Sequence, residues 1–221
     1  MATRGRFVVL EGIDGSGKTT QIERLRDWLP GSGLLPEGAK LVVTREPGGT
    51  AFGEALRELL LHPPQAQVPG ERAELLLYAA DRAQHVADRI APALEAGHWV
   101  LSDRFSGSTE AYQGYGRGLD LAAIRQLERF ATAGLQPDLT LWLDVSLEVA
   151  LERQQRRRRD RIEAEGEDFL RRVWHGFQEI ASEAGWWRID AAAPPDVVAD
   201  DCRRVLLERF PAADGPALPD G

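Results

Sequence analysis

A ten-residue stretch near the start of the chain has the residue types and the spacing that bind phosphate. It reads EGIDGSGKTT over residues 11–20 and fits the pattern G-x-x-x-x-G-K-[ST] at Gly12, Gly17, Lys18 and Thr19. In such a loop the glycines let backbone N–H groups turn toward phosphate oxygens, the lysine reaches the outer phosphates and the hydroxyl ligates magnesium. Lys18 is also one of two lysines in the whole chain. The stretch predicts a nucleotide phosphate-binding loop and disfavours the alternative of a chance glycine turn.

The loop by itself does not identify a reaction, because several classes of protein carry one. GTPases pair it with an N-K-x-D guanine signature, which this sequence lacks. Motor-type ATPases usually carry it on a longer chain with a strand-terminal pair of acids. The choice between reactions therefore depends on what the rest of the chain brings to the loop.

Short apolar runs alternate with longer stretches of helical periodicity along the chain. The strands are expected at 6–11, 40–44, 98–103, 139–145 and 186–190, and the helices at 18–29, 51–61, 71–96, 120–133, 146–156, 166–184 and 195–209. One predicted helix keeps helical spacing along a core face of Phe169, Leu170, Val173, Trp174, Phe177, Ile180 and Ala181. Continuous apolar strands that alternate with helices predict an α/β fold with a mostly parallel sheet and helices on both faces.

Composition limits the class of protein. The 221 residues are 43% hydrophobic and carry a net charge of −8, which suits one domain, expected at 1–210, and disfavours a general nucleic-acid binder. The segment 211–221 is rich in Pro, Gly and Ala, so we expect a disordered tail. One cysteine, Cys202, and apolar runs too short for a signal peptide or a membrane span favour a cytoplasmic protein.

A basic segment stands out against the acidic background. Residues 153–161 read RQQRRRRDR, with six arginines against Asp160, so the segment carries a net charge of +5. Such a local patch favours a small polyanionic ligand over a long one. A solvated basic helix face that binds nucleic acid is the alternative.

Several further motifs follow the loop in a fixed order. They are TREPGGT (44–50), LLLYAADRAQH (75–85), DRFSGSTEAYQGYGRG (103–118), PDLTLWLDV (137–145) and DRIE (160–163). With these motifs, the chain from Phe7 to Phe210 strongly resembles the thymidylate kinase family of nucleoside monophosphate kinases. The resemblance implies a three-layer fold with a five-stranded parallel sheet, and a mobile lid near 153–164. It also implies direct in-line transfer of the γ-phosphoryl group of MgATP to dTMP, which yields dTDP.

For the phosphoryl donor, the resemblance implies that the phosphate loop holds ATP and that Thr19 and Asp103 hold Mg²⁺. Asp103 ends a predicted strand beside the loop, where an acid usually orients magnesium, often through water. The ATP contacts are expected at Gly12, Gly15, Ser16, Gly17, Lys18, Thr19 and Thr20.

For the acceptor, the resemblance implies that Arg45 and Arg104 hold the phosphate of dTMP while Asp14 accepts a hydrogen bond from its 3′-hydroxyl. Both arginines follow the carboxyl end of a predicted strand, where ligands of open parallel sheets bind. Surface ion pairs of these arginines with Glu46 or Asp103, and a solvent-facing Asp14, are the alternatives. Gly48 and Gly49 would let the loop pack closely around the acceptor.

The resemblance further implies that Tyr78 stacks on thymine, that Arg82 hydrogen-bonds its carbonyl edge and that Thr109 lies near the base. The family commonly has phenylalanine where Tyr78 stands. A ring at Tyr112 would crowd the 2′ position and disfavour ribose. A half-buried aromatic beside a solvated arginine is the alternative on this helix. The dTMP contacts are expected at Asp14, Arg45, Pro47, Tyr78, Arg82, Arg104, Thr109 and Tyr112.

An arginine that reaches the transition state of phosphoryl transfer is worth roughly 10³–10⁵ in rate. Some thymidylate kinases carry it in the phosphate loop, where this chain has Gly15 and Ser16. Its absence there agrees with the bacterial type, in which an arginine-rich lid supplies it. Asp160 and Glu163 would anchor that lid or help to bind magnesium. The catalytic residues are expected to be Lys18, Arg104, Arg153 and one of Arg158 or Arg161.

Two other functions stay open. A deoxynucleoside kinase would need a base for the 5′-hydroxyl of its substrate, whereas Arg45 and Arg104 favour an acceptor that already bears phosphate. A nucleotide switch or nucleic-acid-binding module would bind polynucleotides in a strongly salt-sensitive way. A chain that keeps this fold without transfer activity is a further alternative. The resemblance also implies a homodimer, and adenine contacts are guessed near 187–192.

Overall fold

A central parallel sheet organises the fold of the computed structural model, which describes residues 4–64, 68–154, 161–162 and 165–210. Within these ranges, the strands are β1 (Phe7–Glu11), β2 (Leu41–Arg45), β3 (Trp99–Asp103), β4 (Leu139–Asp144) and β5 (Trp187–Asp190). They form one five-stranded sheet in the order β2-β3-β1-β4-β5, and every pair is parallel. In the register, Val8 of β1 is aligned with Leu101 of β3 and Leu139 of β4. The predicted parallel sheet is confirmed, with each strand within one residue of its expected bounds.

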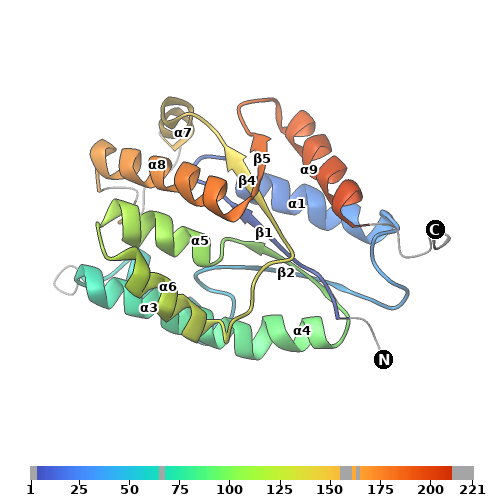
Figure 1. Cartoon of the computed structure of the whole chain (residues 1–221), viewed down its shortest axis with the longest axis horizontal. Helices are drawn as coiled ribbons and strands as arrows, with labels where there is room; N and C mark the ends of the chain where they lie inside the picture. The colour runs from blue at the N-terminus through green and yellow to red at the C-terminus, as the bar shows by residue number, and fades with distance from the viewer. Residues whose placement is uncertain (1–3, 65–67, 155–160, 163–164, 211–221) are drawn as a thin grey trace.

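Helices cover both faces of this sheet (Figure 1). The α-helices are α1 (Lys18–Trp28), α2 (Ala51–Leu61), α3 (Glu71–His85), α4 (Ala91–Glu95), α5 (Ser106–Thr109), α6 (Leu121–Ala131), α7 (Leu147–Gln154), α8 (Glu167–Ala184) and α9 (Pro195–Arg209). A 3₁₀ turn, η1 (Leu29–Gly31), and two π-helical turns, η2 (Val86–Ile90) and η3 (Glu110–Gly116), extend them. The three-layer α/β class that the sequence indicates is therefore confirmed.

The two faces of β1 contribute to two separate hydrophobic cores. Val8 and Leu10 belong to the larger core, which includes side chains of α1, α8 and α9. Phe7 and Val9 belong to the smaller core, which η2 and α4 complete with residues such as Ile90. The strand is thus buried on both faces, which explains why its sequence is a continuous apolar run.

The core face predicted for α8 is confirmed with one difference. Phe169, Val173 and Phe177 are almost fully buried. Trp174 is half-buried and donates its Nε1–H to the carbonyl oxygen of Val145 at 2.8 Å. The indole therefore needs a place where its polar edge meets a backbone acceptor.

One helical region has no counterpart in the sequence-based expectation. Residues 106–116 form α5 and η3 although Gly107, Gly114 and Gly116 lie among them, and glycine costs about 1 kcal/mol relative to alanine in a helix. Tertiary contacts favour the helix instead. The buried carboxylate of Glu11 accepts the backbone N–H groups of Phe105 at 2.9 Å and Ser108 at 3.1 Å, and η3 packs against α8. Local propensity gives no sign of either contact.

The predicted tail at 211–221 and the segments 155–160 and 163–164 of the predicted lid lie outside the described residues. In the part of the chain that is described, no helix is both long and apolar enough to cross a membrane.

Candidate functional site

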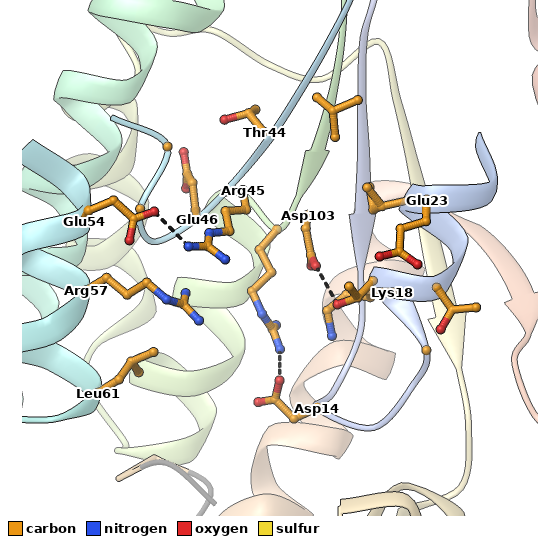
Figure 2. Close-up of a pocket in the computed structure, with 18 of the residues that line it drawn as sticks. Asp14, Lys18, Glu23, Thr44, Arg45, Glu46, Glu54, Arg57, Leu61 and Asp103 are labelled. Atoms are coloured by element: carbon orange, nitrogen blue, oxygen red, sulfur yellow. Dashed lines mark hydrogen bonds and ion pairs between the residues drawn. The ribbon is translucent and has the colours of Figure 1, made fainter. Parts of the chain in front are cut away.

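The carboxyl ends of β1, β2 and β3 meet at one edge of the sheet, which is where parallel α/β sheets bind ligands. A cavity of about 850 Å³ opens at this edge (Figure 2). Its lining comes from the phosphate loop, from the ends of β2 and β3, from α2 and from Arg153 of α7. This volume is within the usual range of small-molecule sites. We call it the larger cavity.

The predicted phosphate loop turns from β1 into α1 on one side of the larger cavity. Gly15 and Gly17 have φ angles of 86° and 95°, and a Cβ on Gly15 would lie 2.5 Å from the carbonyl oxygen of Ala150. Both backbone conformation and space therefore require glycine at position 15. The Lys18 Nζ donates to the carbonyl oxygens of Gly12 at 2.9 Å and Ile13 at 3.1 Å. Burial, together with a nearby guanidinium, lowers the pKa of Lys18 to about 8.

The predicted magnesium residues lie next to each other. The Thr19 Oγ1 is 3.4 Å from Asp103 Oδ2, where the start of α1 faces the end of β3. The other oxygen, Asp103 Oδ1, is buried and has no hydrogen-bond partner in the described structure. A buried carboxylate oxygen beside a hydroxyl suits a hard cation such as Mg²⁺. These two residues therefore fit the ion that the sequence predicts.

Arg104 lies where the larger cavity meets its neighbour. Its Nη2 donates to Asp14 Oδ1 at 2.6 Å, and its Nη1 donates to Gly12 O at 3.1 Å and to Ser108 Oγ at 2.8 Å. The residue has a φ of 74°, in the left-handed region that non-glycine residues rarely adopt. Backbone strain of this kind concentrates at functional sites.

Asp14 is held in its ionised form by its surroundings. The Tyr112 hydroxyl donates to Asp14 Oδ2 at 2.6 Å. Burial alone would raise the pKa of this carboxyl. The charges of Arg104 and Lys18 outweigh burial and hold the pKa of Asp14 well below its usual range. Asp14 is therefore not an ordinary solvent-facing loop acid, because both of its carboxylate oxygens have a partner in the site.

A second cavity of about 90 Å³, which we call the smaller cavity, adjoins the first. The two linings share Asp14, Glu46, Arg57, Leu61 and Arg104. The smaller cavity also contains the residues predicted to lie at the base and the sugar, namely Tyr78, Arg82, Thr109 and Tyr112, together with the predicted dTMP contact Pro47. Arg45, the remaining predicted dTMP contact, lines the larger cavity. The fold thus brings every predicted dTMP contact to one pair of connected cavities.

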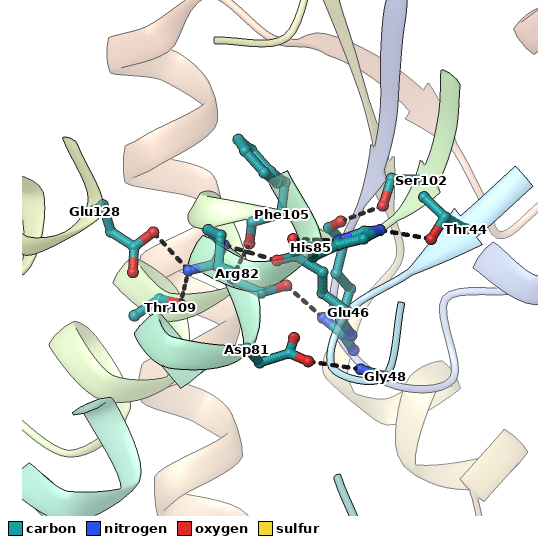
Figure 3. Close-up of polar contacts among 12 residues, drawn as sticks. Thr44, Glu46, Gly48, Asp81, Arg82, His85, Ser102, Phe105, Thr109 and Glu128 are labelled. Atoms are coloured by element: carbon teal, nitrogen blue, oxygen red, sulfur yellow. Dashed lines mark hydrogen bonds and ion pairs between the residues drawn. The ribbon is translucent and has the colours of Figure 1, made fainter. Parts of the chain in front are cut away.

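Arg82 is fixed by a buried polar network (Figure 3). Its side chain is 2% exposed, so it is not the solvated arginine of the alternative interpretation. Nε donates to Glu46 at 2.7 Å, Nη1 donates to Glu128 at 2.5 Å and Thr109 Oγ1 at 2.8 Å, and Nη2 donates to Phe105 O at 3.0 Å. One N–H of Nη2 has no partner within the described ranges. The guanidinium is therefore rigid and has a single donor left for a ligand.

Arg45 and Arg57 direct their guanidinium groups into the larger cavity (Figure 2). Arg45 pairs with Glu54 of α2 at 2.8 Å and is half exposed, so its partner is neither of the two acids considered from the sequence. Arg57 donates its Nη1 to Pro47 O at 3.0 Å. The sequence analysis missed Arg57, whose only signal is its place one turn after Glu54 on the helix that follows TREPGGT.

Two further cavity residues were also missed. Gln113 is 2% exposed and Ile162 is 4% exposed, and both line the smaller cavity. Each lies inside a motif that was recognised, beside Tyr112 in one case and within DRIE in the other. Their residue types gave no indication of which way the side chains would face.

The predicted lid arginines occupy different places. Arg153 lines the larger cavity, and it donates to Gly15 O at 3.3 Å and to Ala191 O at 3.1 Å. Arg161 does not line the larger cavity and donates instead to Glu74 at 2.5 Å and to Leu60 O at 2.8 Å. Arg158 lies outside the described residues. Of the two candidates that the structure describes, Arg153 is the one that contacts the phosphate loop.

Comparison with known proteins agrees with this geometry. A family model described as thymidylate kinase matches residues 10–202. The chain is 64% identical over 205 residues to the thymidylate kinase of Synechococcus sp. (strain RCC307), covering 93% of this chain and 97% of that protein. It is 62% identical over 206 residues to the thymidylate kinase of Parasynechococcus marenigrum (strain WH8102), covering 93% and 99% of the two chains. With these matches over nearly its whole length, the chain belongs to the thymidylate kinase family.

Proposed function

We propose that this protein is an ATP-dependent dTMP kinase that transfers the γ-phosphoryl group of MgATP in line to the 5′-phosphate of dTMP. The observation that carries the proposal is the pair of connected cavities, with Arg104 at their junction and the phosphate loop on one side. A donor on the loop and an acceptor in the smaller cavity would then present their phosphates to each other. Family membership supports both substrates.

On the donor side, the phosphate loop would hold ATP through its backbone N–H groups and Lys18. Thr19 and Asp103 would hold the metal, and Mg²⁺ neutralises charge on the β- and γ-phosphates when it is bound. Arg153 is our preferred lid arginine, because its guanidinium already contacts the carbonyl oxygen of Gly15. Phosphoryl transfer depends mainly on positioning and on such electrostatic stabilisation.

On the acceptor side, Arg45, Arg57 and Arg104 would bind the 5′-phosphate of dTMP. An acceptor phosphate is already an anion, so the reaction needs no strong general base and no covalent intermediate. Asp14 would accept a hydrogen bond from the 3′-hydroxyl, since its low pKa keeps the carboxylate ionised. Tyr112 would leave no room for a 2′-hydroxyl, which favours a deoxyribose.

The polar groups of the smaller cavity suit a base with a carbonyl next to an N–H. The free Nη2–H of Arg82 would donate to a carbonyl oxygen, and Gln113 Oε1 would accept the N3–H of the base. Tyr78 would stack on the ring, as an aromatic face does with any base. Thymine and uracil present this pattern, whereas cytosine presents an amino group in place of the carbonyl.

We also propose a homodimer, for which three exposed apolar side chains provide support. Phe52 of α2, Leu76 of α3 and Phe130 of α6 are 52%, 57% and 86% exposed. The three helices pack in series, α2 against α3 and α3 against α6. Large exposed apolar side chains that gather on neighbouring elements mark interaction surfaces.

The proposal is tested by ADP release from MgATP with a panel of acceptors: dTMP, dUMP, dCMP, dGMP, AMP, UMP and thymidine. We expect a strong response to dTMP, a weaker one to dUMP and almost none to thymidine. A response to thymidine but not to dTMP would favour a deoxynucleoside kinase and overturn the roles of Arg45 and Arg104. If no acceptor stimulates ADP release, binding of ATP and polynucleotide would be measured next.

A further inference from the structure

One side-chain amide that lines the smaller cavity is held in one orientation by a residue outside that cavity. Gln113 lines this cavity, and its Nε2 donates to Glu74 Oε1 at 2.8 Å. Glu74 is fully buried on α3, one turn before Tyr78 and two turns before Arg82. In the described residues, the other end of the amide, Gln113 Oε1, has no hydrogen-bond partner.

Glu74 acts only as an acceptor in this environment. Its Oε2 also accepts from Arg117 Nη2 at 3.0 Å and from Arg161 Nη2 at 2.5 Å. Burial opposes ionisation, but the hydrogen bonds from Arg117, Gln113 and Arg161 outweigh it and lower the pKa of Glu74. An ionised carboxylate has no proton to donate. The Glu74 carboxylate therefore accepts a hydrogen bond from the Gln113 amide nitrogen and repels the amide oxygen.

This asymmetry determines which end of the amide a ligand meets. With Nε2 directed at Glu74, the Oε1 of Gln113 is left for the cavity. Turning the amide over would place two acceptors, Oε1 and the carboxylate, against each other, and would leave a buried acceptor without a partner. A base must therefore supply a donor at this position, which thymine and uracil do through N3–H and cytosine does not.

We propose that Glu74 is a positioning residue that locks the Gln113 amide and thereby sets the preference for a keto pyrimidine over an amino pyrimidine. The inference rests on the proposed function, because it requires a pyrimidine nucleotide in the smaller cavity. Glu74 itself does not line that cavity, so it acts through Gln113. Arg82 supplies a separate part of the preference through its free Nη2–H.

The test compares kcat/KM for dTMP, dUMP and dCMP in the wild-type protein and in Glu74→Gln. A glutamine at this position can donate to Gln113 Oε1, so the amide is free to turn over. We expect the dTMP-to-dCMP ratio to fall about tenfold or more, which is the effect of losing one well-placed hydrogen bond in a buried site. The dTMP-to-dUMP ratio should stay within about twofold, because both bases present the same N3–H.

Glu165→Gln is the matched control. Glu165 accepts from Arg117 at 2.6 Å and lies 3.8 Å from Arg161, so its loss perturbs the same arginines without touching Gln113. We expect its dTMP-to-dCMP ratio to equal that of the wild type. A fall as large as that of Glu74→Gln would show that the arginines and not the amide set the preference, and would overturn the inference.

A double-mutant cycle shows whether Glu74 acts through Gln113. In a Gln113→Met background, Glu74→Gln should leave the dTMP-to-dCMP ratio unchanged, and a further fall would contradict the mechanism. If Glu74→Gln does not fold, NMR of the Gln113 side chain in the dTMP-bound wild type replaces it. One Nε2 proton of Gln113 should be protected from exchange with water. Two freely exchanging Nε2 protons would contradict a fixed orientation of the amide.

Failure of this inference is distinguishable from failure of the proposed function. If the wild-type protein phosphorylates dTMP in preference to dCMP and Glu74→Gln leaves the dTMP-to-dCMP ratio unchanged, only the role of Glu74 in orienting the Gln113 amide is disproved. A wild-type protein that transfers no phosphate to dTMP disproves the proposed function and the inference with it.

Discussion

At the scale of single residues, the site holds two cations close together before any phosphate is bound. Lys18 is buried in its loop, and the charge of Arg104 adds to burial in lowering the pKa of Lys18 to about 8. Asp14, Asp103 and Glu11 act in the opposite direction. The ammonium therefore gains most of its electrostatic stabilisation when a polyanion arrives. Part of the affinity for ATP should depend on the protonation of this one side chain.

We predict that ATP binding takes up a proton above pH 8. Triphosphate beside the Lys18 Nζ favours the charged amine and raises its pKa in the complex. At pH 9 most free protein would have a neutral Lys18, so binding should take up about one proton, and ATP affinity should fall up to about tenfold per pH unit above pH 8. Calorimetry in buffers of different ionisation enthalpy measures this uptake.

Lys18→Met is the control for the proton uptake. The variant should bind ATP more weakly at every pH and take up almost no proton at pH 9. Uptake that persists in Lys18→Met would assign the titration to another group.

At the scale of elements, α3 lines the smaller cavity and also contacts the loop after β2, which lines the larger cavity. Tyr78 and Arg82 face the smaller cavity, while Asp81 and His85 face the loop that follows β2 (Figure 3). Asp81 Oδ1 accepts the backbone N–H of Gly48 at 3.1 Å. A shift of this helix would therefore move the base contacts and the loop at Gly48 together.

The same helix predicts an unusual dependence of stability on pH. Burial and the charge of Glu46 raise the pKa of Asp81 from 3.8 to about 6. The folded protein binds the proton more tightly than the unfolded chain, so this contribution to stability is present below pH 4 and is lost as pH rises through 6. Asp81→Asn keeps an acceptor for Gly48 without the charge. Its free energy of unfolding should exceed that of the wild type by about 1–3 kcal/mol at pH 8, and this difference should shrink until it nearly vanishes below about pH 4.

Urea unfolding at several pH values measures this difference. Asp88→Asn is the control, because Asp88 is exposed on the continuation of the same helical run. That variant should follow the pH profile of the wild type. A stability difference for Asp81→Asn that is the same at about pH 3.5 and at pH 8 would contradict the assignment of the proton to Asp81.

How much the sequence predicts differs between these elements. Strands such as β1 and the helix after the phosphate loop were predictable, because burial on both faces and a glycine pattern are local signals. The α5–η3 region was not, since the contact of Glu11 with its first N–H groups joins distant residues. Glu74 and Gln113 illustrate the same limit within the site. Their positions lie in or beside recognised motifs, but their hydrogen bond depends on how two helical elements pack.

At the scale of the whole molecule, the site occupies one edge of the sheet and the exposed apolar side chains lie on helices beside it. Leu76 is two residues before Tyr78 on α3, and Phe52 is the second residue of α2, the helix that carries Arg57. A partner that covers α2, α3 and α6 would therefore stabilise α2 and α3, which line the smaller cavity. Dimer formation and dTMP affinity should be coupled for this reason.

We predict that Phe130→Glu weakens a homodimer. Phe130 is 86% exposed, and a charge placed in the centre of an apolar interface costs at least about 2 kcal/mol, so the dimer Kd should rise about thirtyfold or more. Val197→Glu is the matched control, because Val197 is 48% exposed on α9, a helix of the other layer. Sedimentation velocity over a concentration series measures both. A wild-type protein that stays monomeric at all concentrations, or equal weakening by both variants, would exclude this surface as the interface. If Phe130→Glu alone becomes monomeric and also raises the KM for dTMP, dimer contacts stabilise the acceptor cavity.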